Sequence, residues 1–443
     1  MLSYVALTIQ TMRTESPNKS TKIDLSTRLK ELKINQLAID CGFKKRNSGK
    51  IEAVDLIHCF YSASNTGQFS LSSWAIQLSR SCKIKLTKQA VFYRVNSNFI
   101  VLLKSILERA ILKHGKYKKR SLNSRFNNVY LHDSTSLKLP DSLSAHYKGN
   151  YSLGKEKAVA KIQAIYNVTK ECFASLRLDP YTRNDQTASA DILPILKKGD
   201  LVIRDMGYFV LPNFRKIIEK GADFISLYRY AVSILDETTY EPICLGKILK
   251  NKKRIKLQFL LGAKEHLPCT LIAIKVSDKI ANARRRKAKK DRDRRKNYTA
   301  DRLELLGWDI FVCSMNDIEA KEIQEIYSTR WHIEIIFKSW KSELKLEANI
   351  PKQLKYVYMA EAVIYLQLIN IVLMLNPILI QLRLLSKKIC RQISLLKATP
   401  FMMIALVENG MEISLEEMEK SLQIVLYEQR KRKTMADKLE ILT

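Results

Sequence analysis

The feature that most constrains the fold is a run of short strands and helices between residues 126 and 228. In some segments apolar and polar residues alternate, as in a half-buried strand, and in others the apolar residues recur with the period of a helix. We expect strands at 129–133, 160–168, 172–178, 201–205 and 223–228, and helices at 186–198 and 212–220. Three strands followed by alternating helices and strands predict an α/β fold.

The region before this run is predicted to be helical. Residues 21–115 carry Lys and Arg throughout, and 74–80 and 86–95 have the pattern of two short helices joined by a turn. Thr87 is a suitable N-cap for the second helix. The pair is compatible with a DNA-binding helix-turn-helix, but we favour two ordinary packed helices, because no residue in it is diagnostic.

The region after the run returns to strands and then to helices. Residues 230–278 are mostly strand-like, and 308–314 are predicted to form one more strand. A long helix is expected from Asp317 to Leu346, and residues 355–443 are expected to be helical.

The long helix has a chemically unusual flank. At about 3.6 residues per turn, one strip of it carries Tyr327, Arg330, Glu334 and Lys341 beside an apolar stripe that is suited to packing. A carboxylate can bind a metal ion, and the cations and the phenol beside it can bind a phosphate. The alternative is a solvated flank with ordinary ion pairs, for example between Glu334 and Lys338.

Two aspartates upstream favour the metal-binding interpretation. Asp133 and Asp205 each follow residues of a predicted strand. Carboxylates at the ends of adjacent strands, joined by Glu334 from a packed helix, would form an oxygen-rich site for Mg²⁺ or Mn²⁺. Two such ions can activate an attacking oxygen and stabilise a leaving oxygen in phosphodiester chemistry. Each aspartate alone could cap a turn or a helix, but the three carboxylates in this order predict a catalytic metal site.

The net charge indicates a polyanionic partner. The chain has 76 Lys plus Arg and 44 Asp plus Glu, which gives a formal net charge of +32. Such an excess repels itself unless a polyanion neutralises it, which favours nucleic acid over an acidic membrane surface. Ten of the thirteen residues from Arg284 to Lys296 are Lys or Arg, beginning with Arg284, Arg285 and Arg286. We expect this run to bind a DNA backbone without reading bases, and the alternative is a solvated helix with no partner.

The cysteines and the apolar segments bear on the compartment. The eight cysteines form no C-x-x-C pair and lie mostly among apolar residues, as reduced thiols do in a cytoplasmic protein. Residues 1–12 lack the basic segment and the cleavage site of a signal peptide. The most apolar stretch, 362–375, is followed by Asn376-Pro377 and is shorter than the roughly 20 residues of a membrane span. We therefore expect a helix that ends at this proline and is buried in a protein core.

Three motifs occur in order along the chain. They are His132-Asp133-Ser134-Thr135, then Arg204-Asp205-Met206-Gly207-Tyr208, then Tyr327, Arg330, Glu334 and Lys341 at their spacing. The last set resembles the YREK signature of bacterial insertion-sequence transposases of the IS-four group, which are DDE enzymes. The first two resemble the blocks that carry their two aspartates, although glycine is commoner in place of Ser134. The resemblance covers about residues 125–350, and the flanking regions match only in general character.

The resemblance implies an RNase H-like core, which is a mixed sheet with helices on both faces, interrupted by a β-rich insertion before the last catalytic helix. The implied division has five parts. They are a helical DNA-binding region (1–120), the first part of the core (121–229), the insertion with its basic run (230–315), the catalytic helix (316–350) and a helical C-terminal region (351–443).

The resemblance also implies a cut-and-paste reaction with two Mg²⁺ or Mn²⁺ ions. Tyr327, Arg330 and Lys341 would hold DNA phosphates near the cut end, and Trp308 would stack on a flipped base unless it is an ordinary core aromatic. Water would nick one strand, and the freed 3′-hydroxyl would attack the opposite strand to give a hairpin. The hairpin would be opened, and the 3′-end would then join target DNA. The implied partners are the element's terminal inverted repeats, target DNA and a second copy in a homodimeric synaptic complex, in a bacterial cytoplasm at the nucleoid.

Other functions fit parts of the pattern. A structure-specific nuclease on the same fold would keep the three carboxylates but would need neither the flipping tryptophan nor a second DNA end. A non-catalytic DNA-binding protein derived from a transposase would keep the charge and lose a carboxylate, and all three are present. A membrane-surface protein would need its basic residues on one face of a helix, whereas the run from Arg284 is basic nearly all round.

Overall fold

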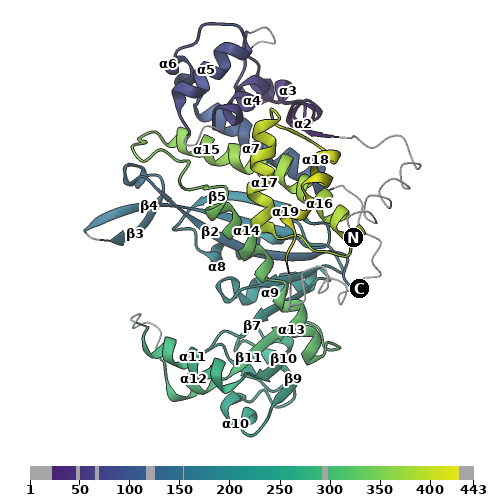
Figure 1. Ribbon diagram of the computed structural model, residues 1–443. Coiled ribbons are helices and arrows are strands. Elements are labelled where there is room, and N and C mark those ends of the chain that lie inside the picture. The colour runs from purple at the N-terminus through teal and green to yellow at the C-terminus, as the bar shows by residue number, and fades with distance from the viewer. Residues whose placement is uncertain are drawn as a thin grey trace.

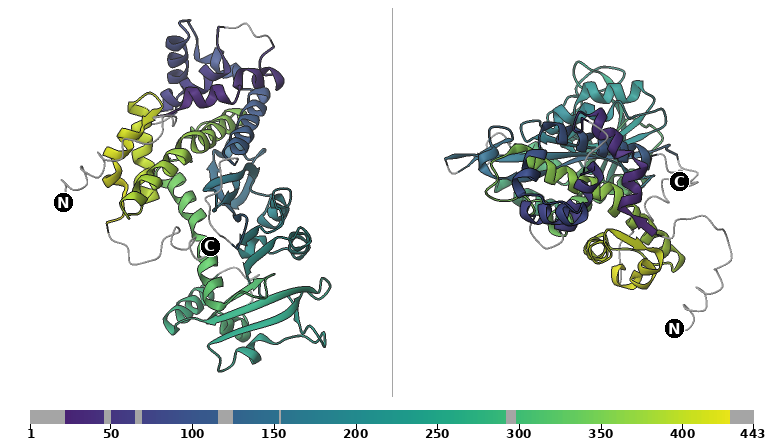
Figure 2. Two further views of the ribbon diagram at one scale, coloured as in Figure 1. Left: turned by 90° about the vertical axis from the view of Figure 1, so that its right-hand side faces the viewer. Right: turned by 90° about the horizontal axis from the view of Figure 1, so that it is seen from above.

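In the computed structural model of the chain, the described residues are 22–45, 50–64, 69–115, 125–152, 154–291 and 298–428 (Figure 1). Ten strands of this part of the chain form one sheet through the middle of the molecule, and helices lie on both of its faces. The left view of Figure 2 shows the N-terminal helices at one end of the molecule and the segment 230–315 at the opposite end.

Five strands make up the central part of the sheet, in the order β5-β4-β2-β6-β7. They are β2 (Val129–Leu139), β4 (Lys155–Asn167), β5 (Cys172–Pro180), β6 (Leu201–Arg204) and β7 (Asp223–Leu227). β2, β6 and β7 run parallel, whereas β4 is antiparallel to both β2 and β5. An antiparallel meander followed by two parallel strands is the arrangement of an RNase H-like core, which confirms the predicted fold class.

The same sheet continues beyond β7 into the segment 230–315. Its strands there are β8 (Ile234–Leu235), β9 (Arg254–Leu261), β10 (Leu267–Lys275) and β11 (Trp308–Cys313). The helices of this segment are α10 (Leu245–Leu249), α11 (Asp278–Lys289) and α12 (Ala300–Leu305). β11 pairs antiparallel with β7 and with β10, so backbone hydrogen bonds join this segment directly to the central strands. At the other edge, β3 (Lys148–Ser152) pairs with the start of β4 in a projecting hairpin (Figure 1).

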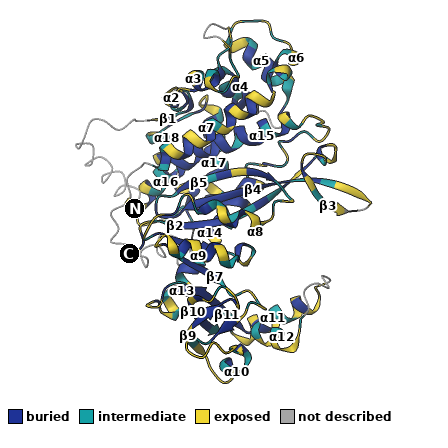
Figure 3. Cartoon of the chain, turned by 180° about the vertical axis from the view of Figure 1, so that it is seen from behind, coloured by how far each residue is buried: buried dark blue, intermediate teal, exposed yellow. Residues whose placement is uncertain are grey.

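Both faces of the central sheet are buried, because successive side chains of each strand point to opposite hydrophobic cores. In β6, Leu201 and Ile203 belong to one core and Val202 belongs to the other. α14 (Trp331–Ser342) packs in the first core, and α9 (Leu211–Glu219) packs in the second. Figure 3 shows the buried residues gathered along the sheet and on the inward sides of these helices.

The N-terminal and C-terminal helices pack together over the first core. The N-terminal helices are α2 (Leu25–Glu31), α3 (Ile34–Asp40), α4 (Ala53–Ser64), α5 (Leu71–Ser81), α6 (Lys88–Arg94) and α7 (Ser97–Gly115). The C-terminal helices are α15 (Val357–Asn370), α16 (Asn376–Lys388), α17 (Leu395–Glu408), α18 (Leu415–Lys420) and α19 (Leu422–Val425). α7 contacts both α15 and β5, and β1 (Lys22–Asp24) pairs with β12 (Glu412–Ser414). The two regions therefore form one packed body.

Several predicted elements are present with small changes in their bounds. The helix pair predicted at 74–80 and 86–95 corresponds to α5 and α6, and Thr87 caps α6 by accepting a hydrogen bond from the backbone N–H of Ala90. Gly221 follows α9 with φ of +69°, a conformation that glycine adopts without steric cost.

The single long helix predicted from Asp317 to Leu346 is wrong in the structure. It consists of α13 (Ala320–Ser328) and α14, and α13 begins after Glu319, whose side chain forms a capping box with Glu322. Between the two helices, the backbone N–H groups of Thr329 and Arg330 donate to carbonyls three residues earlier. These tighter turns interrupt the regular helix at the level of Arg330.

The helix predicted at 186–198 is also shorter than expected. It consists of α8 (Asp185–Ala188) and a 3-10 turn at Ser189–Ile192, followed by turns. Ser189 donates its hydroxyl to the carbonyl of Tyr208 and accepts from the buried Arg204, so it is held by tertiary contacts. Pro194 then removes a backbone donor that a continuing helix would need.

The apolar helix does not end at Asn376-Pro377, contrary to the prediction. A π-helical turn at Ile371–Leu375 joins α15 to α16, and the wider turn accommodates the proline, whose ring would otherwise clash with the preceding helical turn. By length and composition, Val357–Lys388 could cross a membrane, and so could α6 and α7 taken as one bent span. However, 89% of the most apolar window of Val357–Lys388 is buried inside the protein, as predicted for a core helix.

Candidate active site

Asp133 and Asp205 come together because their strands are parallel neighbours. β2 and β6 pair in register up to His132 and Arg204. The residue that follows each member of this last pair is one of the two aspartates. Asp205 was predicted to be the last residue of its strand, and it directly follows β6. Asp133 lies inside β2 rather than after it, because β2 continues to Leu139 in antiparallel pairing with β4.

Glu334 reaches the same place from α14. It lies in the first turn of the helix, while Ile333 and Phe337 belong to the core that also holds Leu131 of β2. An open cavity of about 670 Å³ lies between this helix and the two strand ends. Its lining residues are Asp133, Ser134, Thr135, Asp205, Arg330, Glu334, Phe337, Lys338, Lys341 and Ser342. The three carboxylates singled out in the sequence thus line one cavity.

Arg330 connects the carboxylates of this cavity. Its Nη1 lies 2.6 Å from Oε1 of Glu334 and 3.8 Å from Oδ2 of Asp133, and its side chain is only 11% exposed. The guanidinium also lies over the rings of Tyr327 and Trp331. Two donors here are buried with no hydrogen-bond partner among the described residues, namely Nε of Arg330 and the hydroxyl of Tyr327. Both atoms are shielded from solvent, so a phosphate oxygen would reach them only after the side chains rearrange.

Burial raises the pKa of Asp133 to about 7. The nearby carboxylates of Asp205 and Glu334 act in the same direction. The backbone N–H of Ser134, which donates to Oδ1 of Asp133 at 2.8 Å, and the Arg330 guanidinium both lower this pKa. Because the effect of burial is the larger one, ionising Asp133 at neutral pH is energetically unfavourable. A cation bound in the cavity would reduce this cost.

The donor atoms of the cavity fit a hard divalent cation. Asp133, Asp205 and Glu334 supply carboxylate oxygens, which are the ligands that Mg²⁺ and Mn²⁺ prefer. Among the residues that the structure describes, no three His, Cys, Asp or Glu side chains are already arranged around one metal position. The contacts of Arg330 with Glu334 and Asp133 place a positive guanidinium among the carboxylates instead.

Of the predicted DNA-binding residues, the structure brings Arg330 and Lys341 into the cavity. Tyr327 is buried beside it, at 7% exposure, and packs against Phe311. Trp308 lies elsewhere, in the second core at 8% exposure, so its stacking on a base stays a prediction.

The basic run is described from Arg284 to Asp291, and its remaining residues, 292–296, lie outside the described part of the chain. Arg284 donates to the Trp308 carbonyl and pairs with Asp309 at 2.7 Å. Arg285 and Arg286 donate to the carbonyls of Leu303 and Asn282. Arg284 is thus paired with a residue outside the run, because β11 brings Asp309 within reach.

Sequence reasoning missed two residues of this region. Lys338 lines the cavity one turn after Glu334, and the sequence offered it only as a surface ion-pair partner. For Trp331, which neighbours Arg330, the sequence predicts packing rather than chemistry, but the side chain is 57% exposed beside Arg330. The break in the helix before Trp331 changes its direction, which a continuous helical wheel could not reveal.

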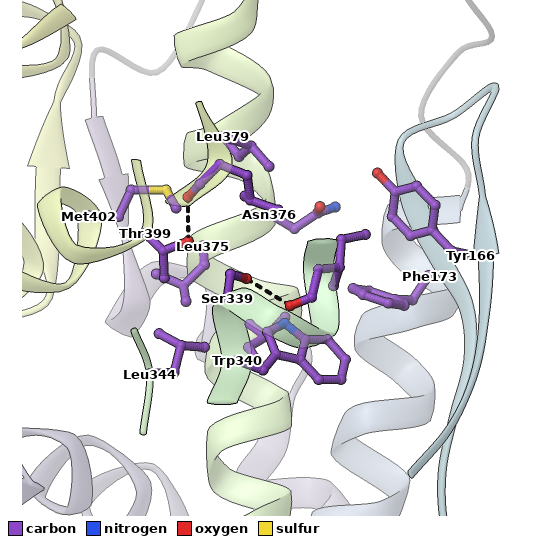
Figure 4. Close-up of a pocket in the computed structure, with 13 residues that line it drawn as sticks. Tyr166, Phe173, Ser339, Trp340, Leu344, Leu375, Asn376, Leu379, Thr399 and Met402 are labelled. Carbon is purple, nitrogen blue, oxygen red and sulfur yellow. Dashed lines mark hydrogen bonds between the residues drawn. The ribbon is translucent and has the colours of Figure 1, made fainter. Parts of the chain in front are cut away.

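The side of α14 away from the carboxylates borders a separate small pocket of about 40 Å³ (Figure 4). Trp340 and Ser339 of α14 face Phe173 of β5 and Thr399 of α17 across it. Its lining carries no charged side chain, so it offers no carboxylate to a metal ion and no cation to a phosphate. We interpret it as a packing imperfection behind α14.

Comparison with known proteins identifies the family. Residues 124–357 match the family described as "Transposase DDE domain". The transposase for insertion sequence element IS231F of Bacillus thuringiensis subsp. israelensis is 24% identical over 414 residues, which cover 86% of each chain. The transposase for insertion sequence element IS1151 of Clostridium perfringens is 26% identical over 373 residues, or 76% of this chain and 77% of the relative. A solved piggyBac transposase synaptic complex with hairpin DNA aligns over 94% of this chain and 90% of that chain, with a TM-score of 0.45 and 9% identity.

The matched segment runs from just before β2 to the start of α15, and it contains every residue that lines the cavity. It is just over half of the chain, and the insertion-sequence relatives extend the similarity to the flanking helices. The chain therefore belongs to the family of transposases with a DDE domain.

Proposed function

We propose that this chain performs cut-and-paste transposition of an insertion sequence, with Asp133, Asp205 and Glu334 as the ligands of two Mg²⁺ or Mn²⁺ ions. The observation that carries the proposal is the single cavity in which these carboxylates meet Arg330 and Lys341. When bound, the ions would polarise the phosphodiester and stabilise negative charge on the attacking and leaving oxygens. The chain's own residues would bind and orient the DNA.

The carboxylates are held by elements of different kinds. Asp133 and Asp205 come from neighbouring strands of a buried sheet, and Glu334 comes from a helix packed on that sheet. Rigid elements hold a constellation more closely than loops do. The raised pKa of Asp133 makes this group costly to ionise alone, so its proton leaves most readily when a cation arrives.

The cations of the cavity hold the DNA backbone. Arg330 offers a planar guanidinium that can bind a phosphate with two hydrogen bonds, and Lys338 and Lys341 offer point charges on the same helix. Once the Arg330 side chain moves onto a phosphate, its Nε and the Tyr327 hydroxyl, which are buried in the free protein, would bind the same phosphate. This arrangement would orient the scissile phosphodiester towards the carboxylates.

The reaction needs no nucleotide hydrolysis. Hydrolysis at the element end frees a 3′-hydroxyl, and opening of the hairpin is a second hydrolysis. Hairpin formation and strand transfer each exchange one phosphodiester bond for another. We assign three parts to holding the element ends and target DNA: the N-terminal region 1–120, whose described residues are mainly helical, the exposed cations of α11, and a second copy of the chain. In this division, residues 121–229 and 316–350 form the catalytic core, 230–315 form the insertion and 351–443 form the C-terminal region. The protein would act in the bacterial cytoplasm.

The test is cleavage of a duplex that carries the element's own ends. The wild-type protein should nick it only with Mg²⁺ or Mn²⁺ present, and Asp133→Asn, Asp205→Asn and Glu334→Gln should each abolish nicking but retain end binding. Asp141→Asn is a control, because this aspartate of the same region pairs with Lys157 at the surface. Normal nicking by one of the three variants would remove that residue from the set. Cleavage of branched DNA without any need for element ends would favour a structure-specific nuclease.

A further inference from the structure

A fourth carboxylate lies beside the cavity without lining it. Asp185 is the first residue of α8, and its side chain is 31% exposed. Its Oδ1 accepts hydrogen bonds from the Ser134 hydroxyl at 2.9 Å, from Nζ of Lys161 at 3.1 Å and from Nε2 of Gln163 at 3.4 Å. Ser134 is the residue directly after Asp133, so this carboxylate is connected to the first ligand of the proposed site.

Asp185 also contacts the segment that carries the second aspartate. A Cβ added to Gly207, two residues after Asp205, would lie 3.2 Å from Oδ2 of Asp185. The glycine thus permits a close approach that a larger residue would disturb. The next residue, Tyr208, donates its hydroxyl to Oε1 of Gln163 at 2.6 Å, and Gln163 is one of the donors to Asp185. One carboxylate therefore contacts both aspartate-bearing segments.

The surroundings of Asp185 indicate why a charge is needed there. Lys161 lies on β4 with a side chain only 9% exposed, and Asp185 is its ion-pair partner at 3.1 Å. Across the strands, Gln163 of β4 pairs in register with Ser134 of β2. A buried ammonium without an anion would be strongly unfavourable. The pair therefore fixes Lys161 and, through the shared Oδ1, the rotamer of Ser134.

Two simpler roles do not account for these contacts. The N-cap of α8 is Asn184, whose side chain accepts from the backbone N–H of Thr187, so the helix does not require Asp185 as its cap. Oδ1 of Asp185 already accepts from three donors, and Asp185 is not among the residues that line the cavity. It is therefore placed to support the ligands rather than to be one of them.

We propose that Asp185 is a positioning residue, which holds Asp133 and Asp205 in the arrangement that divalent ions require by bonding Ser134 and by contacting Gly207. This inference rests on the proposed function, since it takes Asp133 and Asp205 as metal ligands. Groups that orient metal ligands in this way typically contribute about 10–100-fold to metal affinity or activity. No contact of Asp185 with DNA is required.

The experiment measures Mn²⁺ affinity by electron paramagnetic resonance on the full chain bound to an end duplex that has already been cut. Asp185→Ala and Ser134→Ala are compared with Asp191→Asn. Asp191 is a matched control, because it belongs to the same segment and its ion pairs are with Arg183 and Arg177. Asp185→Asn is the milder variant, since it keeps an acceptor for Ser134 and loses only the charge. Nicking of uncut ends is measured in parallel.

Asp185→Ala should weaken Mn²⁺ binding and lower kcat by about 10–100-fold, with KM for the end duplex unchanged. Ser134→Ala should also lower Mn²⁺ affinity and kcat. In the double variant the loss, expressed as free energy, should be smaller than the sum of the two single losses, because the two groups share one hydrogen bond. A merely structural role would lower the active fraction and leave the Mn²⁺ midpoint of the remainder unchanged. If Asp185→Ala does not fold, Asp185→Asn and Ser134→Ala decide the question on the same scale.

Mn²⁺ affinities of the Asp185 and Ser134 variants equal to that of Asp191→Asn would overturn the inference. Asp133→Asn is measured in the same series. If this variant loses Mn²⁺ binding while the Asp185 and Ser134 variants do not, the inference about Asp185 fails and the proposed function stands. Unchanged Mn²⁺ binding and nicking in Asp133→Asn would instead overturn the proposed function itself.

Discussion

Asp133→Asn should make the metal-free protein more stable at pH 8 while it abolishes DNA cleavage. The folded protein raises the pKa of Asp133 from 3.8 to about 7. The folded state therefore binds this proton more tightly than the unfolded state does. Its contribution to stability is fully present below about pH 4 and is lost as the pH rises through about 7.

The magnitude follows from the difference between the ordinary pKa of 3.8 and the pKa of about 7 that Asp133 has in the folded protein. At about 1.36 kcal/mol per unit, ionised Asp133 lowers the free energy of unfolding by up to about 4 kcal/mol above pH 7. Asparagine has nearly the same shape, carries no charge at any of these pH values and keeps an acceptor for the Ser134 N–H. The stability difference between the variant and the wild type should therefore grow from near zero at about pH 4 towards this upper bound at about pH 8.

The assay is urea unfolding of both proteins with a chelator present, at several pH values between 4 and 8. Taking the difference between the two proteins cancels the pH dependence of every group that does not interact with Asp133; the groups that do are Arg330, Asp205 and Glu334. In a second series, millimolar Mg²⁺ should raise the unfolding midpoint of the wild type and leave that of the variant nearly unchanged, because only the wild type keeps all three ligands. A stability difference that stays constant across the pH range would refute the reasoning.

Three further changes test the site, the DNA contacts and the packing. Glu334→Gln should abolish cleavage and leave end binding nearly intact, whereas Lys341→Ala should weaken end binding by a graded amount. Gel-shift and cleavage assays on the same duplex distinguish the two effects. Normal cleavage by Glu334→Gln would exclude this residue as a metal ligand. Replacing the exposed cations of α11 and its C-terminal end by Gln should flatten the dependence of log K on log salt by about 0.9 for each lost phosphate contact, and an unchanged slope would place α11 away from DNA. These cations are Lys279, Arg286, Lys287, Lys289 and Lys290. Trp340→Ala, beside the pocket in Figure 4, should cost about 3–5 kcal/mol of stability in urea unfolding, and a cost below about 1 kcal/mol would mean that the surrounding helices collapse into the space.

The central strands and their aspartates could be predicted from the sequence because local patterns determine them. The apolar run Leu201–Arg204 becomes a strand buried on both faces, and β2 pairs with it in parallel. Once two strands are parallel and in register, residues that follow equivalent positions are neighbours, which is why Asp133 and Asp205 meet. Thr87 likewise caps α6 through a contact within its own turn. Predictions of this kind need only short-range geometry.

What could not be predicted depends on residues that are distant in the sequence. β1 pairs with β12 across most of the chain, and neither three-residue segment has a strand pattern strong enough to identify it alone. Arg284 lies in a run that looked uniformly solvated, yet β11 presents Asp309 to it. Asp185 lies in a segment that was expected to be an ordinary helix, and its contacts with Ser134 and Lys161 arise only from the assembled sheet.

Arg330 indicates how metal binding and DNA binding are linked in this cavity. Its guanidinium contacts Glu334 at 2.6 Å and Asp133 at 3.8 Å, so in the free protein it neutralises two of the proposed ligands. The same group cannot also bind a phosphate with two hydrogen bonds, so DNA that recruits Arg330 would release the carboxylates for divalent ions. Arg330→Gln should therefore bind Mn²⁺ several-fold more tightly than the wild type without DNA, and yet cleave DNA ends more slowly. These opposite changes cannot both come from partial unfolding, since unfolding lowers both. Weaker Mn²⁺ binding by Arg330→Gln without DNA would show that the guanidinium organises the carboxylates instead of competing for them.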